Sequence, residues 1–431
     1  MSNAFFNRQV FHLHPDASRV VVRPFRPAIE PRDLNPVDKT RANRIVDRVL
    51  RLDAAAVSSQ LAEVLDNFFG RHRNLLQAFE AQTQDMEQAL APHVAFTSEQ
   101  RRLVGAYFLH EYSFEAAALF NPSIVPHPDQ SGVPDGAKRF ILSLRAVGEG
   151  HVSSLTFRSG VVGPEGTIQV DSPARLASIP RVVSTTPTDN GERTELAFSP
   201  EQDVSERVIF PVTASQSNGI EDARFVQFDA EGERVFYATY TAYTGRAIRS
   251  ELLETRDFLT FRMSPLAGSA ARNKGMALFP RRLNGRYAMV TRQDNENLYL
   301  VYSDDLYTWN EGVPILKPEF PWEFVQIGNC GSPIELDEGW LLLTHGVGPV
   351  RRYAIGAVLL DKADPSRVLA RSREPLVRPE ASDRAGYVPN VVYTCGGMRH
   401  LGRIVLPYAV SDTFCAFATM RIDALLETLR S

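Results

Sequence analysis

The chain has 431 residues, of which 44% are hydrophobic and 23% charged, and its formal net charge is −4. This composition is typical of a globular protein and gives no electrostatic reason to expect nucleic acid or an anionic membrane as a partner. No run of 18 or more apolar residues occurs and the N-terminus lacks a secretory pattern, so neither a membrane span nor a signal peptide is expected.

The N-terminal third of the chain predicts two kinds of structure. Residues 1–39 are rich in proline and arginine and carry one apolar run, VVVRPF (20–25), which predicts an extended arm or an added strand. Residues 40–120 place apolar side chains three and four positions apart, with almost no glycine or proline. This spacing predicts amphipathic helices that continue through 98–120, until NPSIVPHPDQSG (121–132) ends the pattern.

The sequence pattern of residues 121–431 predicts an all-β structure. Short β-rich runs alternate with turns that contain glycine, aspartate, asparagine and proline. Pairs of strands recur roughly every 50–60 residues, and this period predicts about five blades of a β-propeller. A sandwich or a barrel would share the alternation but not the repeated unit. The predicted fold is therefore mainly β: a five-bladed β-propeller over 121–431 with an N-terminal helical extension over 40–120.

Polar side chains stand at the ends of many of these apolar strands. A repeated unit aims such strand ends at a common axis. Charge beside a core strand is unfavourable unless it is paired, so several such positions indicate a site. The positions are Glu221, Asp222, Arg224, the 240–243 region with Tyr243, Arg272, Asn273, Lys274, Arg292, Gln326, Asn329, His345 and Asp412.

The stretch NGIEDARFVQF (218–228) places two carboxylates and a guanidinium at the mouth of a predicted strand. An Asx turn at the strand entrance is the structural interpretation of Asp222. Arg224 follows two residues later, on the same face of the strand, where it can hold the Asp222 carboxylate. Glu221 must then point the other way or anchor the turn.

The cationic strand ends also have structural interpretations. Lys274 fits a surface hairpin, His345 fits a core histidine, and Arg292 fits a salt bridge at the rim with Asp294. If these cations instead converge with one or two carboxylates, they form a site for phosphate or sulfate beside a polyol.

Several common chemistries lack their motifs in this sequence. The nucleotide motifs GxxxxGK[ST] and GxGxxG, the zinc-peptidase motif HExxH and the hydrolase motif GxSxG are absent. Acidic residues are scattered, so no metal site is expected. Cys330, Cys395 and Cys415 are far apart, which predicts reduced thiols in a cytoplasmic protein.

Residues 115–426 carry an ordered series of motifs: NGIEDARFVQF, YTAYTG, RNKGMALFPRRLNGRYAMVTR, YSDDLYTW, GNCGSPIELDEGWLLLTHGV, YAIGAVLLDKADPSRVLARSREPLVRPE, GYVPNVVYTCG and SDT. Taken in this order, the motifs resemble glycoside hydrolase family 130, the β-mannoside phosphorylases and related β-mannosidases. The resemblance implies a five-bladed β-propeller. The helical segment 40–120 lies outside the minimal family domain, where such additions contribute to oligomer contacts.

The resemblance also implies roles for individual residues. Asp222 matches the general acid, which acts through the O3 hydroxyl of the mannosyl unit with inversion. Arg292 and His345 match a phosphate cage, so inorganic phosphate is the expected co-substrate, a manno-oligosaccharide the expected partner, and no cofactor is expected. Three further matches concern the sugar: Arg272 and Asn273 hold the mannosyl unit, and Asp412 binds its hydroxyls.

One position departs from the family pattern. Many phosphorylases have a lysine before IGxGxxP, whereas this chain has Gln326, which offers a dipole instead of a full charge. Either a nearby cation compensates, with Lys274, Arg351 and Arg352 as candidates, or phosphate binding is weakened and the enzyme hydrolyses. Retention of Arg292 and His345 favours phosphorolysis.

Two alternatives to the phosphorylase remain open. An inverting β-mannosidase would need a base such as Glu149, Glu296 or Glu335. A non-catalytic carbohydrate-binding propeller would need the pocket but form no product. The linkage and the acceptor sugar cannot be read from the sequence. Further predicted substrate contacts are Glu221, Arg224, Tyr243 and, on the acceptor side, His151, and a homo-oligomer is the expected assembly.

Overall fold

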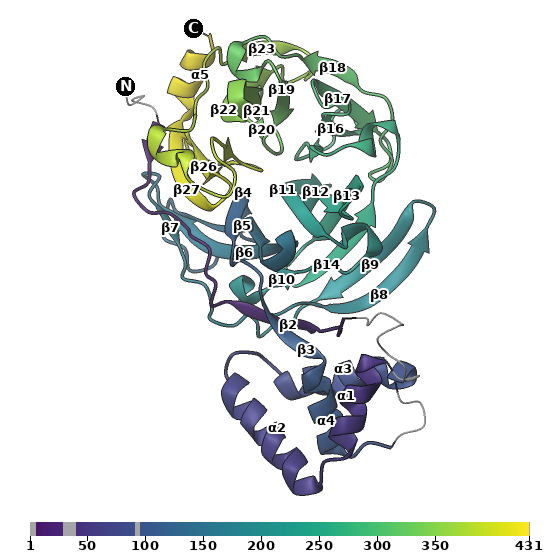
Figure 1. The fold of residues 1–431 in the computed structure, drawn as a ribbon. Helices are drawn as coiled ribbons and strands as arrows, with labels where there is room; N and C mark the ends of the chain where they lie inside the picture. The colour runs from purple at the N-terminus through teal and green to yellow at the C-terminus, as the bar shows by residue number, and fades with distance from the viewer. Residues whose placement is uncertain (1–5, 29–39, 91–94, 431) are drawn as a thin grey trace. The chain divides into compact units, whose positions relative to one another are not determined.

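The computed structural model describes residues 6–28, 40–90 and 95–430 (Figure 1). The chain divides into two compact units. The larger unit contains residues 6–16, 115–174 and 179–431, and the smaller unit contains residues 17–114 and 175–178. Two strands lie in the predicted arm, and residues 29–39 of that arm lie outside the described part of the chain.

Helices make up most of the smaller unit. Asp53 begins one of them by accepting a hydrogen bond from the Ala56 amide at 2.8 Å, and Thr97 and Gln100 form a capping box at another. A Cβ added to Gly105 would lie 1.9 Å from the Phe79 carbonyl oxygen, so the missing side chain lets two helices approach closely. The helices are α1 (Arg41–Leu50), α2 (Ala54–Phe68), α3 (Leu75–Leu90) and α4 (Ser98–Tyr107).

The prediction that helix continues through residue 120 is wrong beyond Tyr107. Strand β3 (Leu109–Ser113) follows α4 and pairs antiparallel with β2 (Val20–Pro24), with Val21 opposite Tyr112. Cross-strand pairing of aromatic and β-branched side chains stabilises this ribbon, and it overrides the local helical spacing.

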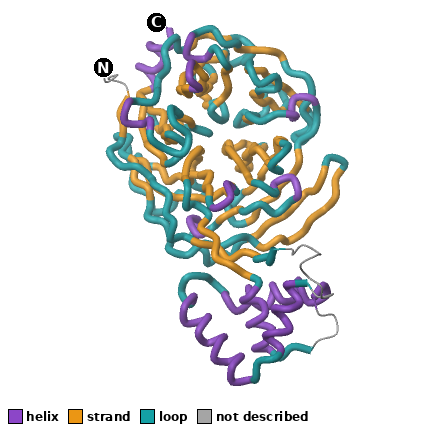
Figure 2. The backbone as a smooth tube through the Cα atoms, in the orientation of Figure 1, coloured by secondary structure: helices purple, strands orange, loops and turns teal. Residues whose placement is uncertain are grey.

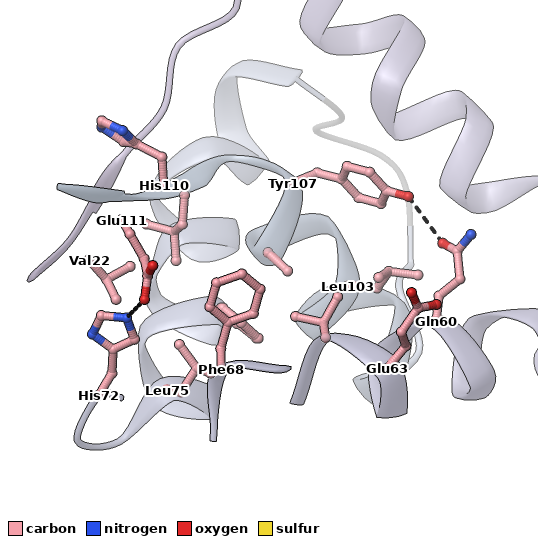
Figure 3. A pocket seen from close by; sticks show the side chains of 14 residues that line it. Val22, Gln60, Glu63, Phe68, His72, Leu75, Leu103, Tyr107, His110 and Glu111 are labelled. Atoms are coloured by element: carbon pink, nitrogen blue, oxygen red, sulfur yellow. Dashed lines mark hydrogen bonds and ion pairs between the residues drawn. The ribbon is translucent and has the colours of Figure 1, made fainter. Parts of the chain in front are cut away.

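A cavity of about 400 Å³ lies inside the smaller unit (Figure 3). Its walls are mostly apolar, and polar pairs stand near its ends: His72 with Glu111 at 2.7 Å, and Tyr107 with Gln60 at 3.0 Å. In each pair the two side chains are hydrogen-bonded to each other, so neither pair converges on the cavity as a catalytic group would.

The larger unit is built from four sheets, and only one pairing among the named strands, β6 with β11, is parallel. The first sheet contains β4 (Ala118–Pro126), β5 (Lys138–Val147), β6 (Ser153–Val162), β7 (Ile168–Val170), β8 (Arg181–Thr188), β9 (Gly191–Ala197), β10 (Val208–Ile209), β11 (Gly219–Ala230), β12 (Glu233–Tyr243), β13 (Ile248–Thr255) and β14 (Thr260–Pro265).

The other three sheets follow in chain order. The second contains β15 (Ala277–Leu278), β16 (Tyr287–Thr291), β17 (Leu298–Ser303) and β18 (Val313–Leu316). The third contains β19 (Gln326–Asn329), β20 (Ile334–Glu335), β21 (Trp340–Gly348), β22 (Arg352–Leu360) and β23 (Val368–Arg371). The last contains β1 (Phe6–Arg8), β24 (Val392–Tyr393), β25 (Met398–His400), β26 (Arg403–Val410) and β27 (Phe414–Arg421), and helix α5 (Ile422–Arg430) follows it.

Apolar clusters join each sheet of the larger unit to the next one along the chain. Ala409 of the last sheet packs with Ala118 and Phe120 of the first, so the series returns to its start. Figure 2 shows the strands of this unit arranged around a common centre. The fold is mainly β, and within the described ranges no helix is long and apolar enough to cross a bilayer.

Candidate active site

A polar cavity of about 140 Å³ lies where strands or strand ends from all four sheets of the larger unit converge. It gathers seven of the residues predicted from the sequence, together with Arg351. The lining residues are Asn121, Arg145, Asp222, Arg224, Lys274, Arg292, Gln326, His345, Arg351, Tyr353, Val391, Tyr393 and Asp412.

Asp222 sits at an irregularity in strand β11. The pairing of β11 with β12 shifts register between Glu221 and Arg224, and Asp222 adopts a left-handed backbone with φ of 54°. Its carboxylate Oδ1 accepts hydrogen bonds from Asn121 Nδ2 at 2.5 Å and from Arg145 Nη1 at 3.3 Å. The bulge therefore turns a buried carboxylate into the cavity instead of leaving it in the alternation of the strand.

The charge state of Asp222 follows from these neighbours. Burial alone would raise the pKa of this carboxyl, but the positive charges of Arg145, Arg224 and Lys274 and the hydrogen bond from Asn121 outweigh burial and lower it. Among these groups Asp222 is thus an anion, and it must take up a proton before it can act as an acid.

Arg224 does not hold the Asp222 carboxylate, which corrects the prediction from the sequence. Its guanidinium donates to the main-chain carbonyl oxygen of Asp222 at 3.0 Å and to the Tyr393 hydroxyl at 2.9 Å. The prediction assumed regular strand alternation between positions 222 and 224, and the bulge breaks that alternation.

Arg145 of β5 ties the two adjacent carboxylates together. Its Nη2 lies 2.6 Å from Glu221 Oε1, while its Nη1 contacts Asp222. Glu221 is absent from the cavity lining and is engaged by this arginine, a position that fits the anchoring role considered from the sequence.

Arg292 and His345 form another part of the cavity wall. His345 Nδ1 lies 3.2 Å from the Asn329 carbonyl oxygen, an acceptor, so Nδ1 carries the proton and Nε2 accepts from Arg292 Nη1 at 3.3 Å. Burial, followed by the charges of Arg292 and Arg224, holds the pKa of His345 well below its usual range, so the ring is neutral. A Cβ on Gly328 would lie 2.2 Å from this ring, so only glycine leaves room for it.

The Arg292 guanidinium has no acidic partner among the described residues. Arg292 is 7% exposed, its Nε has no hydrogen-bond partner, and among the described residues no carboxylate lies within ion-pair distance of its guanidinium. The alternative salt bridge with Asp294 does not form, because Asp294 accepts hydrogen bonds from its own loop, at the Glu296 and Asn297 amides and the Tyr299 hydroxyl.

Asn273 lies beneath this wall and not in the cavity lining. Its side chain accepts from the Lys274 amide at 2.9 Å and donates to the Arg292 carbonyl oxygen at 3.4 Å. Lys274 itself lines the cavity, as does Gln326 of β19. Asn273 thus fixes the backbone of two cationic residues that face the cavity.

Asp412 is the second carboxyl of the cavity. It lies between β26 and β27 in a left-handed conformation with φ of 47°. Burial raises its pKa to about 7, with the negative charge of Asp222 adding to the effect and the Arg145 guanidinium opposing it. At neutral pH one of the two carboxyls is therefore ionised and the other is partly protonated.

The remaining predicted residues lie outside the cavity lining. The Tyr243 hydroxyl donates to the Gly245 carbonyl oxygen, Arg272 is exposed at the end of a 3-10 turn, and His151 contacts the Tyr387 hydroxyl. Arg352, one candidate for a compensating cation, donates to the Pro379 carbonyl oxygen at 3.2 Å and does not line the cavity.

The carboxylates proposed as hydrolytic bases are also absent from the lining. Glu335 forms an ion pair with Arg281 at 2.9 Å, and neither Glu149 nor Glu296 reaches the cavity. Over the described ranges no group of three or more histidine, cysteine or acidic residues could hold a metal ion, and the three cysteines are buried and unpaired.

Sequence reasoning missed Asn121, Arg145, Tyr353 and Tyr393. Arg145 had a usable signal, since it is a single arginine within the apolar run FILSLRAV. Asn121 interrupts the apolar strand ALFNPSIV in the same way. The two tyrosines look like ordinary strand aromatics, and only the tertiary structure brings them to the cavity.

Comparison with known proteins identifies the family. Residues 196–431 match the family model of glycoside hydrolase family 130, described as beta-1,4-mannooligosaccharide phosphorylase. A 1,2-beta-oligomannan phosphorylase of Thermoanaerobacter sp. strain X514 is 34% identical over 215 residues, which is 49% of this chain and 71% of that protein. A beta-1,2-mannobiose phosphorylase of Listeria innocua is 31% identical over 231 residues, 51% of this chain and 63% of that protein.

Solved structures support the same fold. The Listeria innocua beta-1,2-mannobiose phosphorylase in complex with beta-1,2-mannobiose superimposes with a TM-score of 0.52 at 22% identity, over 73% of this chain and 92% of that chain. Another, with a TM-score of 0.53 at 18% identity over 73% of this chain and 87% of that one, is described as part of a mannoside phosphorylase family that contains glycoside hydrolases targeting beta-1,2 mannosidic linkages in Candida mannan. The family model covers more than half of the residues, and the chain belongs to glycoside hydrolase family 130.

Proposed function

We propose that the chain is an inverting β-mannoside phosphorylase, which converts a β-mannoside and inorganic phosphate into α-mannose 1-phosphate and a shortened acceptor. The observation that carries the proposal is the buried Arg292 guanidinium, which faces the cavity without a carboxylate partner. An uncompensated buried cation is costly, and a bound phosphate dianion would neutralise it. The named phosphorylase relatives agree with this reading.

In the proposed reaction, the carboxyl and the cations of the cavity have different tasks. Asp222 provides the proton, through a sugar hydroxyl, to the glycosidic oxygen that leaves with the acceptor. Phosphate held by Arg292 and Lys274 attacks the anomeric carbon from the opposite side, so the C–O bond to phosphate forms as the bond to the acceptor breaks. Because phosphate is already an anionic nucleophile, this reaction needs no general base, only positioning and charge stabilisation.

Substrate binding would also prepare Asp222 to act as an acid. The surrounding cations keep this carboxyl ionised. A phosphate dianion would partly cancel those charges, and a bound sugar would exclude water, so both changes would raise the pKa of Asp222. The enzyme would therefore become competent for proton transfer once both substrates are in place.

Hydrolysis by the same fold is the second candidate, since one structural relative is described with hydrolases of this family. A hydrolase needs a base for the attacking water. Among the described lining residues the carboxyls are Asp222 and Asp412, so the base would have to be Asp412. The cationic wall around Arg292 would then have no anion to bind, which is why phosphorolysis is the better account.

The propeller and the assembly belong to this proposal as well. We infer five blades. The first sheet is counted as two blades, divided between β6 and β11, which share a single parallel residue pair. Each of the other three sheets is counted as one blade. The division into an arm, a helical extension and a propeller, a homo-oligomeric state and a cytoplasmic location remain predictions from the sequence.

A paired incubation tests the proposed function. The purified protein is given β-1,2-, β-1,3- and β-1,4-mannobiose, each with and without inorganic phosphate, and mannose 1-phosphate and free mannose are quantified. We expect mannose 1-phosphate only with phosphate, first with the β-1,2-linked disaccharide, because the two curated relatives described above carry that linkage in their names. Arg292→Gln should abolish the formation of mannose 1-phosphate, while Arg352→Gln, outside the cavity, should retain it.

A further inference from the structure

Gln326 lines the cavity at the position where the family pattern described above has a lysine, so this position brings no charge to the proposed phosphate site. An amide at this position can donate a hydrogen bond, but it cannot supply the point charge of a lysine ammonium. If the proposed function holds, a phosphate dianion there requires a further cation, and the search for one leads to the hairpin between β21 and β22.

Strand register brings that hairpin close to Gln326. Gln326 of β19 lies opposite Val347 of β21, and Val347 lies opposite Tyr353 of β22. Residues directly opposite in antiparallel strands share a face, and neighbouring strands are about 4.8 Å apart. Gln326 and Tyr353 are therefore on the same rung and the same face of this sheet, two strands apart.

The backbone of this hairpin turns so that the Arg351 side chain lies near Tyr353. Val350 and Arg351 are consecutive non-glycine residues with φ of 57° and 52°, and Val350 is 88% exposed. A left-handed conformation is unfavourable for L-residues, most of all for β-branched valine. In this turn the Arg351 guanidinium lies 5.8 Å from the centre of the Tyr353 ring, and Arg351 lines the cavity.

The Arg351 charge is available to a ligand. Among the described residues no carboxylate lies within ion-pair distance of the Arg351 guanidinium, which lies against the Tyr353 ring. Its positive charge also acts on Asp412 of the same lining, where it opposes the rise in the pKa of that carboxyl. The Tyr353 ring in turn stacks on His345, with ring centres 5.8 Å apart, so Arg351 continues the wall that begins with Arg292. Arg352, the next residue, is occupied by the Pro379 carbonyl oxygen.

We propose that Arg351, reaching over Tyr353 from the β21–β22 hairpin, is the phosphate-binding cation that takes the place of the charge missing at Gln326. This assignment rests on the proposed phosphorylase function. It makes Arg351 responsible for phosphate affinity, while proton transfer at Asp222 stays independent of it.

The test compares four variants with the wild type: Arg351→Gln, Arg351→Lys, the matched control Arg352→Gln, and the double variant Arg351→Gln/Gln326→Lys. Two quantities are measured: the KM for phosphate at saturating mannobiose, and the Kd of inorganic phosphate by calorimetry. Loss of a charge-assisted contact predicts a weakening on the order of 10- to 100-fold for Arg351→Gln. Arg351→Lys and the double variant should recover most of the affinity, and Arg352→Gln should match the wild type.

Salt provides a second readout that a purely structural role would not show. Arg351 is exposed, so its contribution should shrink as ionic strength rises, and the gap between wild type and Arg351→Gln should narrow. The inference is overturned if Arg351→Gln binds phosphate as the wild type does, or if Arg352→Gln is impaired equally. If the wild type turns over mannobiose at the same rate with and without phosphate, the proposed function is overturned. The Kd of phosphate for the wild type and for Arg351→Gln, measured by calorimetry, would still decide whether Arg351 binds phosphate.

Discussion

His345 Nε2 lies 3.3 Å from Arg292 Nη1, and the ring serves as a neutral acceptor that orients the guanidinium. The opposite ring nitrogen is directed at the Asn329 carbonyl oxygen, which fixes the tautomer. Since the Arg292 charge keeps the pKa of this buried histidine low, protonation of His345 is strongly opposed. We infer that the histidine expected in the phosphate cage acts on phosphate mainly through Arg292.

Gly328→Ala tests this arrangement without touching a charged group. The new Cβ would meet His345 Cε1 at 2.2 Å, so the ring must move and the hydrogen bond to Arg292 is lost. We expect the KM for phosphate to rise by about tenfold, the effect of one hydrogen bond to a charged group. The matched control is Gly402→Ala, where an added Cβ meets nothing within 4 Å. Equal phosphate KM values for the two variants would contradict the orienting role.

Asp222→Asn removes the proposed proton donor and keeps the shape of the side chain. We expect kcat for mannobiose phosphorolysis to fall about 10²- to 10⁴-fold, the usual contribution of a general acid. Binding of mannobiose, measured by calorimetry, should change little. Asp229→Asn, on the same strand but exposed, serves as the control. A kcat within threefold of the wild type would exclude Asp222 as the acid.

The Asp412 carboxyl predicts a pH-dependent stability. Its pKa is raised from 3.8 to about 7 in the folded protein, so its stabilising contribution is complete below pH 4 and is lost as pH rises through 7. Asp412→Asn should therefore raise the free energy of unfolding at pH 8 by about 2–4 kcal/mol, but not at pH 4. The measurement is denaturant unfolding of the ligand-free protein at both pH values. An equal effect of the substitution at both would show that Asp412 is ionised throughout this range.

The buried ion pair between Arg158 and Glu115 does not line the cavity, so its loss should affect the stability of the fold. Arg158 Nη2 lies 3.0 Å from Glu115 Oε2, and the two side chains are 1% and 0% exposed. Arg158→Ala leaves the Glu115 charge without this partner and should cost about 3–5 kcal/mol in unfolding free energy. Arg256→Ala, which breaks an exposed pair with Glu233, should leave the unfolding midpoint unchanged. Similar unfolding midpoints for the two variants would argue against a structural role for the buried pair.

Regular strand patterns made much of the site accessible from the sequence. Asp222, Arg292, His345 and Asp412 flank apolar runs in the sequence, and all four line the cavity. Arg224 was misassigned because a register shift at Asp222 cannot be read from alternation. Arg145 and Asn121 lie within strands, where a polar residue is read as a solvent-facing position until the neighbouring sheet is known.

The end of the helical segment could not be predicted from the sequence. Residues 98–120 keep helical spacing as far as Tyr107, and the sequence gives no sharp stop there. Pairing of β3 with the distant β2 decides that the next residues form a strand, and such long-range pairing is invisible to local periodicity. The compensation of Gln326 by Arg351 was open for the same reason, since only the hairpin geometry separates Arg351 from Arg352.

The proposed reaction transfers a mannosyl unit to phosphate and not to water. The most direct measurement is the product ratio of mannose 1-phosphate to free mannose, followed by NMR while phosphate is titrated from zero to saturation with the active mannobiose. We expect that every cleaved bond yields α-mannose 1-phosphate and that turnover vanishes as phosphate is removed. Free mannose released at a rate independent of phosphate would contradict it and make the protein a hydrolase.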